Sequence, residues 1–428
     1  MVLNKVFTIL ISAIFLSLFF SGVQLTQEPV KLVPFDVVVV VFSAIVIFIL
    51  ISRSYTYVTI DLLYFSFISL LLLVWHVMHV LGSTYIGRVV TLLAILIRDI
   101  VISVLVATII SNDLIRKSSL SRSFFTVSVL VSFATLPLFL MAVADPSRVV
   151  TGLYRNLIYR MGEGLVPHLQ GFSHNPIYFA TLTLLSLIAG LFVSITNKRH
   201  KIWTKVGLLG LIVTFFMSFQ RGPIIVLMVG MMLMIVVTLP FPTSRRFFEK
   251  YIRRFLYIAP LILFLLLTLR LPGYKFSLYQ RILYRFQGAE WSARLDRWSQ
   301  MLSGEEEIPW LVGHGLREAE RFVGGMFVEN AYVEIFYEQG LIGLILWGLL
   351  FVYILFLGIK KLQKDSAILP WCWGWLLLLL SMSYISMHYD PLTWVVAGII
   401  VGWRSTPNVQ RNLNNSLGMP EQKQFGPF

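Results

Sequence analysis

Long apolar stretches with few charges recur along the whole sequence and constrain the fold more than any other feature. A membrane-spanning helix needs roughly 20 mostly apolar residues. The chain is 57% hydrophobic and only 13% charged, whereas soluble domains carry about 25% charged residues. We therefore predict an all-α, polytopic membrane protein with about twelve transmembrane helices. The expected spans lie at about 6–24, 36–52, 57–80, 86–110, 123–144, 176–196, 205–219, 222–239, 255–270, 341–359, 368–387 and 391–403.

The first apolar segment has the position and length of a signal peptide. It lacks a convincing small-residue cleavage site, and a second apolar segment follows at once, so we expect it to be retained as the first helix. The chain has a single cysteine, Cys372, which excludes an intramolecular disulfide and a thiolate metal cluster.

Lysine and arginine indicate the orientation of these spans. They are concentrated in four connections, at 111–122, 197–205, 241–254 and 360–365. With twelve spans, all four connections and both termini fall on one side, which the positive-inside rule makes the cytoplasm. This bias also accounts for the net charge of +14, so no nucleic-acid partner is predicted.

The same topology defines the predicted domains. Residues 1–403 form the transmembrane bundle, and two long segments, 145–175 and 271–340, face the periplasm. We expect the second of these to be a helical cap over the bundle. The polar tail 404–428 is rich in Asn, Gln, Pro and Gly, a composition typical of disorder.

Arginines collect on the predicted outer side. A guanidinium group stays charged and donates two parallel hydrogen bonds, which suits a phosphate. Several converging arginines would hold a diphosphate. The alternative is that they lie at the membrane interface or pair with nearby acids, but Arg221, in a two-residue turn between two spans, is hard to account for in that way. The candidates are Arg148, Arg155, Arg160, Arg221, Arg281, Arg285, Arg294 and Arg297.

Two further segments precede the tenth expected span. Gly313 and Gly315 flank His314 and permit a sharp turn. Glu329 and Asn330 then stand at the mouth of the helix that leads into the span. A carboxylate there could act as a general base on a sugar hydroxyl. The alternative interpretation of Glu329 is a helix-entry charge that is favourable to the helix dipole.

Four motifs in order carry a resemblance to a known family. They are Ser-x-x-Arg-Gly at 218–222, Ser-x-Arg-Leu-x-x-Trp at 292–298, Pro-x-Leu-x-Gly-x-Gly at 309–315, and Asn-x-Tyr-x-Glu-x-x-x-Glu-x-Gly-Leu-x-Gly at 330–343. Their order resembles the O-antigen ligase and O-antigen polymerase family of the bacterial envelope. The resemblance is strongest over about 205–345.

The resemblance implies a helical membrane bundle of the GT-C-like kind with its active site facing the periplasm. Members of this family act at the bacterial inner membrane and use an undecaprenyl-diphosphate-linked glycan, which they transfer to lipid A–core, to another lipid-linked glycan or to a protein hydroxyl. The resemblance implies no nucleotide sugar, no cofactor and no metal at the transfer step. A polymerase would also work with a chain-length regulator.

The family's functional residues carry over at three positions. Arg221 and Arg294 match the arginines that would grip the diphosphate and stabilise it as a leaving group. Asn330 matches the asparagine of the family's His-Asn pair, but Glu329 stands where the family has histidine. Glu329 is the expected acceptor-side catalytic residue, with His314 or Glu338 as alternative bases. The departure favours a polymerase over a standard ligase.

We expect a second group of residues to bind substrate around this site. His314 and Asn330 would contribute from the second outer segment together with Arg285, and Arg155, Arg160 and His174 from the first. A helix-start turn is the alternative interpretation of His174.

Two pairs of polar residues lie within the expected spans. Arg98 and Asp99 are in the middle of a span, where charges usually face the bundle interior, and an interhelical ion pair or a role in carrier binding would account for them. His76 and His79 have one-turn spacing, but no third ligand is near, so no metal site is predicted.

The leading hypothesis is an inner-membrane glycosyltransferase that uses an undecaprenyl-diphosphate donor. The competing class is a lipid-linked oligosaccharide flippase without covalent chemistry. Such a transporter is expected to show two pseudo-symmetric halves, whereas this chain has one large outer segment late in its sequence.

Overall fold

The computed structural model describes 2–21, 23, 32–52, 57–82, 86–144, 158–161, 166–169, 172–173, 175–196, 201–218, 220–242, 290–303, 309–322 and 328–404, with scattered positions at 245–268. The ninth expected span, 255–270, therefore lies mostly outside the described residues, as do most of the first outer segment, all of 271–289 and the tail after Arg404.

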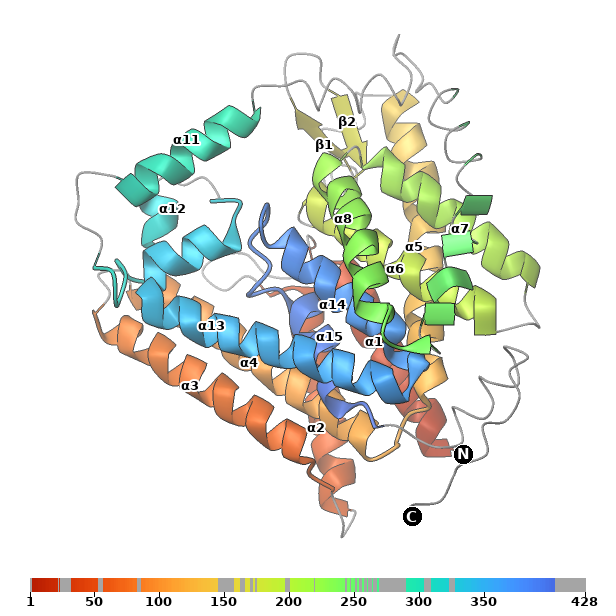
Figure 1. The fold of residues 1–428 in the computed structure, drawn as a ribbon, viewed down its shortest axis with the longest axis horizontal. Coiled ribbons are helices and arrows are strands. Elements are labelled where there is room, and N and C mark those ends of the chain that lie inside the picture. Colours follow the sequence, from red (N-terminus) through yellow and green to blue (C-terminus); the bar gives the residue numbers. More distant parts are fainter. Residues whose placement is uncertain are drawn as a thin grey trace.

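The described chain is a bundle of apolar helices (Figure 1). Seven of them are long and apolar enough to cross a membrane, and four more are apolar but shorter. These findings make the chain a multi-pass membrane protein, while the count of twelve spans stays a prediction. The helices are α1 (Val2–Phe19), α2 (Pro34–Ser52), α3 (Ile60–Gly82), α4 (Ile86–Ser111), α5 (Lys117–Ala144), α6 (Pro176–Thr196), α7 (Lys201–Met217), α8 (Arg221–Thr238), α11 (Glu290–Ser303), α12 (Glu318–Phe322), α13 (Ala331–Lys364), α14 (Leu369–Ser381) and α15 (Pro391–Gly402).

The fold is not purely helical, which modifies the all-α prediction. Within the first outer segment, β1 (Ile158–Met161) pairs antiparallel with β2 (Val166–Leu169), with Arg160 opposite Pro167. The hairpin lies at the end of the bundle that also carries α11 in Figure 1. Short strands of four residues give little periodic signal, so hydropathy alone did not predict them.

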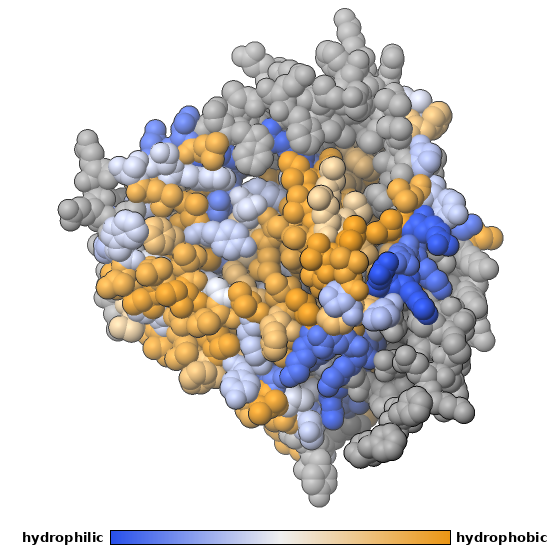
Figure 2. Space-filling view, viewed as in Figure 1, coloured by the Kyte–Doolittle hydropathy of each residue, from blue (hydrophilic) through white to orange (hydrophobic). Residues whose placement is uncertain are grey.

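One surface of the bundle is broadly apolar. Figure 2 shows hydrophobic residues over the region where α3 and α13 lie in Figure 1. Large apolar side chains there are solvent-exposed in the isolated chain, among them Leu63, Phe67, Leu349, Val352 and Phe356. A surface of this kind suits the acyl chains of a bilayer.

A close helix contact joins α15 to α4. A Cβ atom on Gly398 would lie 2.5 Å from the carbonyl oxygen of Ser103, and one on Gly402 would lie 2.3 Å from that of Ala107. The four-residue spacing of both pairs is the small-residue pattern that lets two membrane helices approach closely. This contact fixes α15 against the middle and the end of α4.

Two of the four basic connections predicted for one side, 111–122 and 360–365, lie together at one end of the bundle. The backbone N–H of Arg116 donates to Asn4, and the guanidinium of Arg404 donates to the carbonyl oxygen of Ser111. The indole of Trp403 donates to Asp365 over 3.0 Å. The start of α1, the connections at 112–117 and 365–368, and the end of α15 are therefore neighbours. That this basic end faces the cytoplasm stays a prediction.

Helix α14 is shorter than its predicted span, 368–387, whereas α15 agrees with its predicted span, 391–403, to within one residue, and both are short for a membrane-spanning helix. They contain 13 and 12 residues, or about 20 Å at 1.5 Å per residue, whereas a bilayer core is about 30 Å thick. Because both helices have one end at the basic end, the connection between them, 382–390, lies inside the bundle. We call it the inner turn.

Candidate functional site

One half of the site is built around a break in α13. Gly340 has φ +65° and ψ −166°, which interrupts the helix between Tyr337 and Leu341. Such a break leaves backbone donors and acceptors without helical partners. The docked loop, 309–316, supplies them: His314 and Gly315 donate to the carbonyl oxygens of Tyr337 and Glu338, each over 2.9 Å.

The same loop also accepts hydrogen bonds from the second half of α13. Leu341 donates to Trp310 over 2.8 Å, and Ile342 donates to Leu311 over 3.2 Å. A Cβ on Gly313 would lie 2.5 Å from backbone atoms of Glu338 and Gly340. The docked loop and the broken segment of α13, which come from two separate sequence motifs, are thus one interlocked unit.

The predicted catalytic residues Arg294 and Glu329 are in direct contact. The Nε of Arg294 lies 2.7 Å from Oε2 of Glu329, and the guanidinium of Arg297 lies 3.7 Å from the same oxygen. The side chains of Arg294 and Glu329 are 14% and 28% exposed, so the pair borders solvent. Arg294 and Arg297 are one turn apart on α11 and share a face.

Hydrogen bonds hold both neighbours of Glu329, Val328 and Asn330, in place. The indole of Trp298 donates to the carbonyl oxygen of Val328 over 2.8 Å, which holds α11 against this segment. Asn330 caps α13 by accepting from the backbone N–H groups of Tyr332 and Val333. Glu329 itself has φ +58°, a left-handed conformation that side chains other than glycine rarely adopt.

Arg221 stands at the start of α8 and is only 8% exposed. A helix N-terminus favours an anion because its first N–H groups and its dipole point outward. The next residue, Gly222, packs on the ring of Tyr384, where a Cβ would lie 2.8 Å from the nearest ring atom. The N-terminus of α8 thus borders the inner turn.

The end of α14 and the first residue of the inner turn contact the start of α13. The backbone N–H of Ala331 donates to the carbonyl oxygen of Met382 over 2.8 Å, and the hydroxyl of Tyr332 donates to the carbonyl oxygen of Leu379 over 2.7 Å. Two predicted site segments, 220–222 and 329–332, therefore pack on the same stretch, 379–384. The predicted approach of the Arg221 guanidinium to that of Arg294 stays a prediction.

A buried polar group lies deeper along α13. Glu334 accepts a hydrogen bond from the Ser386 hydroxyl, and Glu338, one turn further, is 1% exposed. Gln339 donates to the hydroxyl of Tyr389 over 3.0 Å. The burial of Glu334 and Tyr389 depends on where the inner turn packs, which a hydropathy pattern does not show.

His314 and His76 hold defined positions in this region. The imidazole of His314 stacks on Tyr337 with ring centroids 4.3 Å apart. The Nε2 of His76 is hydrogen-bonded to the hydroxyl of Tyr389 over 2.7 Å. In the described part of the chain, no group of three or more His, Cys, Asp and Glu could hold a metal ion.

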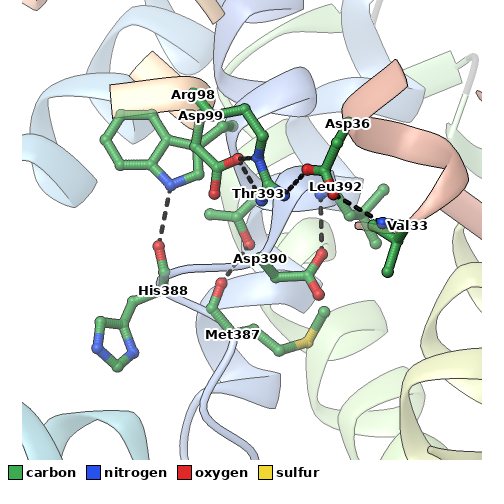
Figure 3. Close-up of polar contacts among 10 residues, drawn as sticks. Val33, Asp36, Arg98, Asp99, Met387, His388, Asp390, Leu392 and Thr393 are labelled. Carbon is green, nitrogen blue, oxygen red and sulfur yellow. Dashed lines mark hydrogen bonds and ion pairs between the residues drawn. The ribbon is translucent and has the colours of Figure 1, made fainter. Parts of the chain in front are cut away.

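The charges in the middle of the bundle form one network (Figure 3). The guanidinium of Arg98 on α4 lies 2.7 Å from Asp36 at the start of α2 and 2.7 Å from its neighbour Asp99. An interhelical ion pair was one of the two explanations that the sequence left open, and Arg98 also pairs with its neighbour Asp99. The long arginine side chain can fold back along the helix, so residues pointing about 100° apart still meet.

The same view shows how the inner turn ends (Figure 3). The carboxylate of Asp390 accepts from the backbone N–H of Leu392 over 2.8 Å and caps α15. The Thr393 hydroxyl donates to Met387, and the Trp394 indole donates to His388 over 3.0 Å. These bonds satisfy an irregular backbone that is buried in protein, which is where such backbone is tolerated at membrane depth.

Four predicted substrate-binding residues are not placed. Arg155, His174 and Arg285 lie outside the described residues. Arg160 is in β1, but its side chain lies outside the described part of the structure. Of the remaining predictions, Arg294, Glu329 and Asn330 are brought together, and Arg221 and His314 lie on segments that pack beside them.

Comparison with known proteins identifies one part of the chain. Residues 206–348 match the family model Wzy_C, described as O-antigen ligase. The matched region runs from α7 through the first half of α13 and contains Arg221, Arg294, the docked loop and Glu329. No curated protein matches the chain. The region resembles the family over the stretch that the four sequence motifs indicated.

Proposed function

Starting from the O-antigen ligase domain at residues 206–348, we propose that this chain is a glycosyltransferase of the bacterial inner membrane. The donor is a glycan on undecaprenyl diphosphate, and the acceptor is a sugar hydroxyl of a second lipid-linked glycan or of lipid A–core. The active site faces the periplasm, and a chain-length regulator is the expected partner if the product is a polymer.

The observation that carries this proposal is the contact between Arg294 and Glu329 over 2.7 Å. It joins the residue assigned to the donor diphosphate with the residue assigned to the acceptor. Reaction at a glycosidic bond requires these two functions within a few ångströms of the same anomeric carbon. Because the two assigned functions meet at one point, the contact supports a shared active site rather than an incidental surface ion pair.

The proposed reaction is a single displacement. The acceptor oxygen forms a bond to the anomeric carbon, while the bond from that carbon to the diphosphate oxygen breaks. The diphosphate leaves with the electron pair, and the acceptor proton passes to the carboxylate of Glu329. Arg221 and Arg294 stabilise the charge that develops on the diphosphate, and Asn330 holds the backbone that presents Glu329.

Complementation of a strain that lacks this gene tests the arginines. Arg221→Lys and Arg294→Lys keep the charge but lose the bidentate fork, and we expect each to reduce glycan transfer at least tenfold. Arg245→Lys is a matched control, since Arg245 forms an exposed pair with Glu249 over 2.9 Å. Normal amounts of long glycan from both test variants would contradict the diphosphate assignment.

A second set of variants tests the base. Glu329→Gln keeps the size of the side chain and removes the proton acceptor, so we expect transfer to be abolished while donor binding survives. Glu329→His should retain part of the activity, because imidazole can also accept the proton. Transfer at the normal rate by Glu329→Gln would move the base to His314, Glu338 or His174.

A further inference from the structure

We propose that Arg294 and Arg297 form an anion site for which the carboxylate of Glu329 and the donor diphosphate compete. Binding of the diphosphate would displace Glu329 and free it to serve the acceptor. The inference rests on the proposed function, and it adds Arg297 to the donor site. Because the diphosphate must break this ion pair before Glu329 is released, the donor binds before Glu329 can serve the acceptor.

The geometry of α11 supports a two-arginine site. Arg294 and Arg297 are three residues apart in this helix, which places them on one face, and both point at Oε2 of Glu329, at 2.7 and 3.7 Å. Two guanidiniums around one oxygen anion are also the arrangement that binds a phosphate. The bond from Trp298 to Val328 keeps α11 beside the carboxylate.

A carboxylate and a phosphate cannot share these donors. Like charges a few ångströms apart repel, and the hydrogen-bond donors of Arg294 that face Glu329 can serve one anion at a time. While Arg294 and Arg297 hold Oε2 of Glu329, that oxygen occupies the position that an oxygen of the diphosphate would take. The two bound states therefore exclude one another.

Glu329 is placed so that it can leave the site. Its side chain is 28% exposed, so water can solvate the released carboxylate. Its backbone is left-handed at φ +58°, a conformation that carries strain for a residue with a side chain. The neighbours on both sides are anchored, Val328 by Trp298 and Asn330 by the N-cap of α13, so movement is confined to Glu329.

Direct titration tests the competition. The full chain in lipid nanodiscs is titrated with undecaprenyl diphosphate, and binding is followed by tryptophan fluorescence, since Trp298 adjoins the site. Glu329→Gln removes the competing charge, so we expect its Kd to fall about 3–10-fold relative to the unmodified chain. Glu329→Asn should change the Kd in the same direction, because asparagine tolerates the left-handed backbone.

The direction of the change in Kd distinguishes competition from the other roles that the Glu329–Arg294 pair could have. A pair that merely orients Arg294 for its ligand would give weaker binding when Glu329 is neutralised, and a surface pair without function would give an unchanged Kd. Either outcome in both variants overturns the competition. Glu249→Gln, which breaks the exposed pair with Arg245, is the control and should leave the Kd unchanged.

A double-mutant cycle tests Arg297 separately. If Arg297 binds the diphosphate, Arg297→Gln weakens binding about tenfold both in the unmodified chain and in the Glu329→Gln background. If Arg297 serves only to hold Glu329, its replacement leaves binding unchanged in the Glu329→Gln background, which overturns its assignment to the donor site.

The failure of this inference is distinct from the failure of the proposed function. Should the unmodified chain bind undecaprenyl diphosphate while neither Glu329 variant binds it more tightly, the competition is wrong and the transferase proposal stands. Should the unmodified chain show no binding of undecaprenyl diphosphate at any accessible concentration, both proposals fall.

Discussion

Replacing Gly340 by alanine should release the docked loop from α13. A Cβ at this position would lie 2.5 Å from both the carbonyl carbon and the carbonyl oxygen of Leu311. Carbon atoms in contact are ordinarily about 3.5–4.0 Å apart, so the loop would have to retreat by roughly 1 Å. The obstacle is backbone rather than the end of a flexible side chain, and no rotamer change relieves it.

The free-energy cost of Gly340→Ala to the docked state has two parts. Alanine at φ +65° and ψ −166°, a backbone region essentially restricted to glycine, costs about 1–3 kcal/mol. Retreat of the loop weakens the four hydrogen bonds between 310–315 and 337–342, each with a net contribution of about 0.5–1.5 kcal/mol. If half of the hydrogen-bond contribution is lost, the docked state is destabilised by about 2–6 kcal/mol in all.

Limited proteolysis measures this loss. Arg317 directly follows the docked loop, so trypsin cleavage there reports loop opening. Because cleavage of a transiently open segment follows its equilibrium population, we expect cleavage at least tenfold faster in Gly340→Ala than in the unmodified chain. Gly313→Ala should behave alike, since a Cβ there would lie 2.5 Å from backbone atoms of Glu338 and Gly340.

Gly348→Ala is the matched control within α13. A Cβ at Gly348 would meet nothing within 4 Å, and alanine is the better helix former by up to about 1 kcal/mol. This variant should be cleaved at the unmodified rate. Equal cleavage of Gly340→Ala and Gly348→Ala would refute the interlocked arrangement of the docked loop and the break.

Three other predictions concern the bundle. Arg98→Gln removes the partner of Asp36 and Asp99 and should lower the free energy of unfolding by about 3–5 kcal/mol, measured as a lower melting temperature in detergent. Adding Asp36→Asn should recover part of the loss, and an unchanged melting temperature would mean that the network is not stabilising. Asn330→Ala removes the cap of α13 and should cost about 1–2 kcal/mol, whereas Asn330→Asp should melt close to the unmodified chain; equal melting temperatures for all three would argue against the cap. A phosphatase reporter fused after Lys364 should be inactive in the periplasmic assay, and activity there would reverse the predicted orientation.

Several features of this protein follow from local sequence alone. The apolar segments indicate a membrane protein because transfer into a bilayer depends on the residues of one helix at a time. The four motifs between 218 and 343 indicated the O-antigen ligase region because each is a short continuous pattern. The sequence placed Glu329 and Asn330 at the mouth of the helix that leads into the tenth span, and α13 begins at Ala331.

Other features were decided by tertiary structure, because they join residues distant in sequence. The contact of Arg294 with Glu329 spans 35 positions and depends on how α11 lies against α13. Helix α14 ends at Ser381, before the predicted end of its span, and the residue after it, Met382, accepts a hydrogen bond from Ala331 at the start of α13. The break at Gly340 exists because the docked loop supplies its hydrogen bonds. No hydropathy window contains these partners, so only packing could determine them.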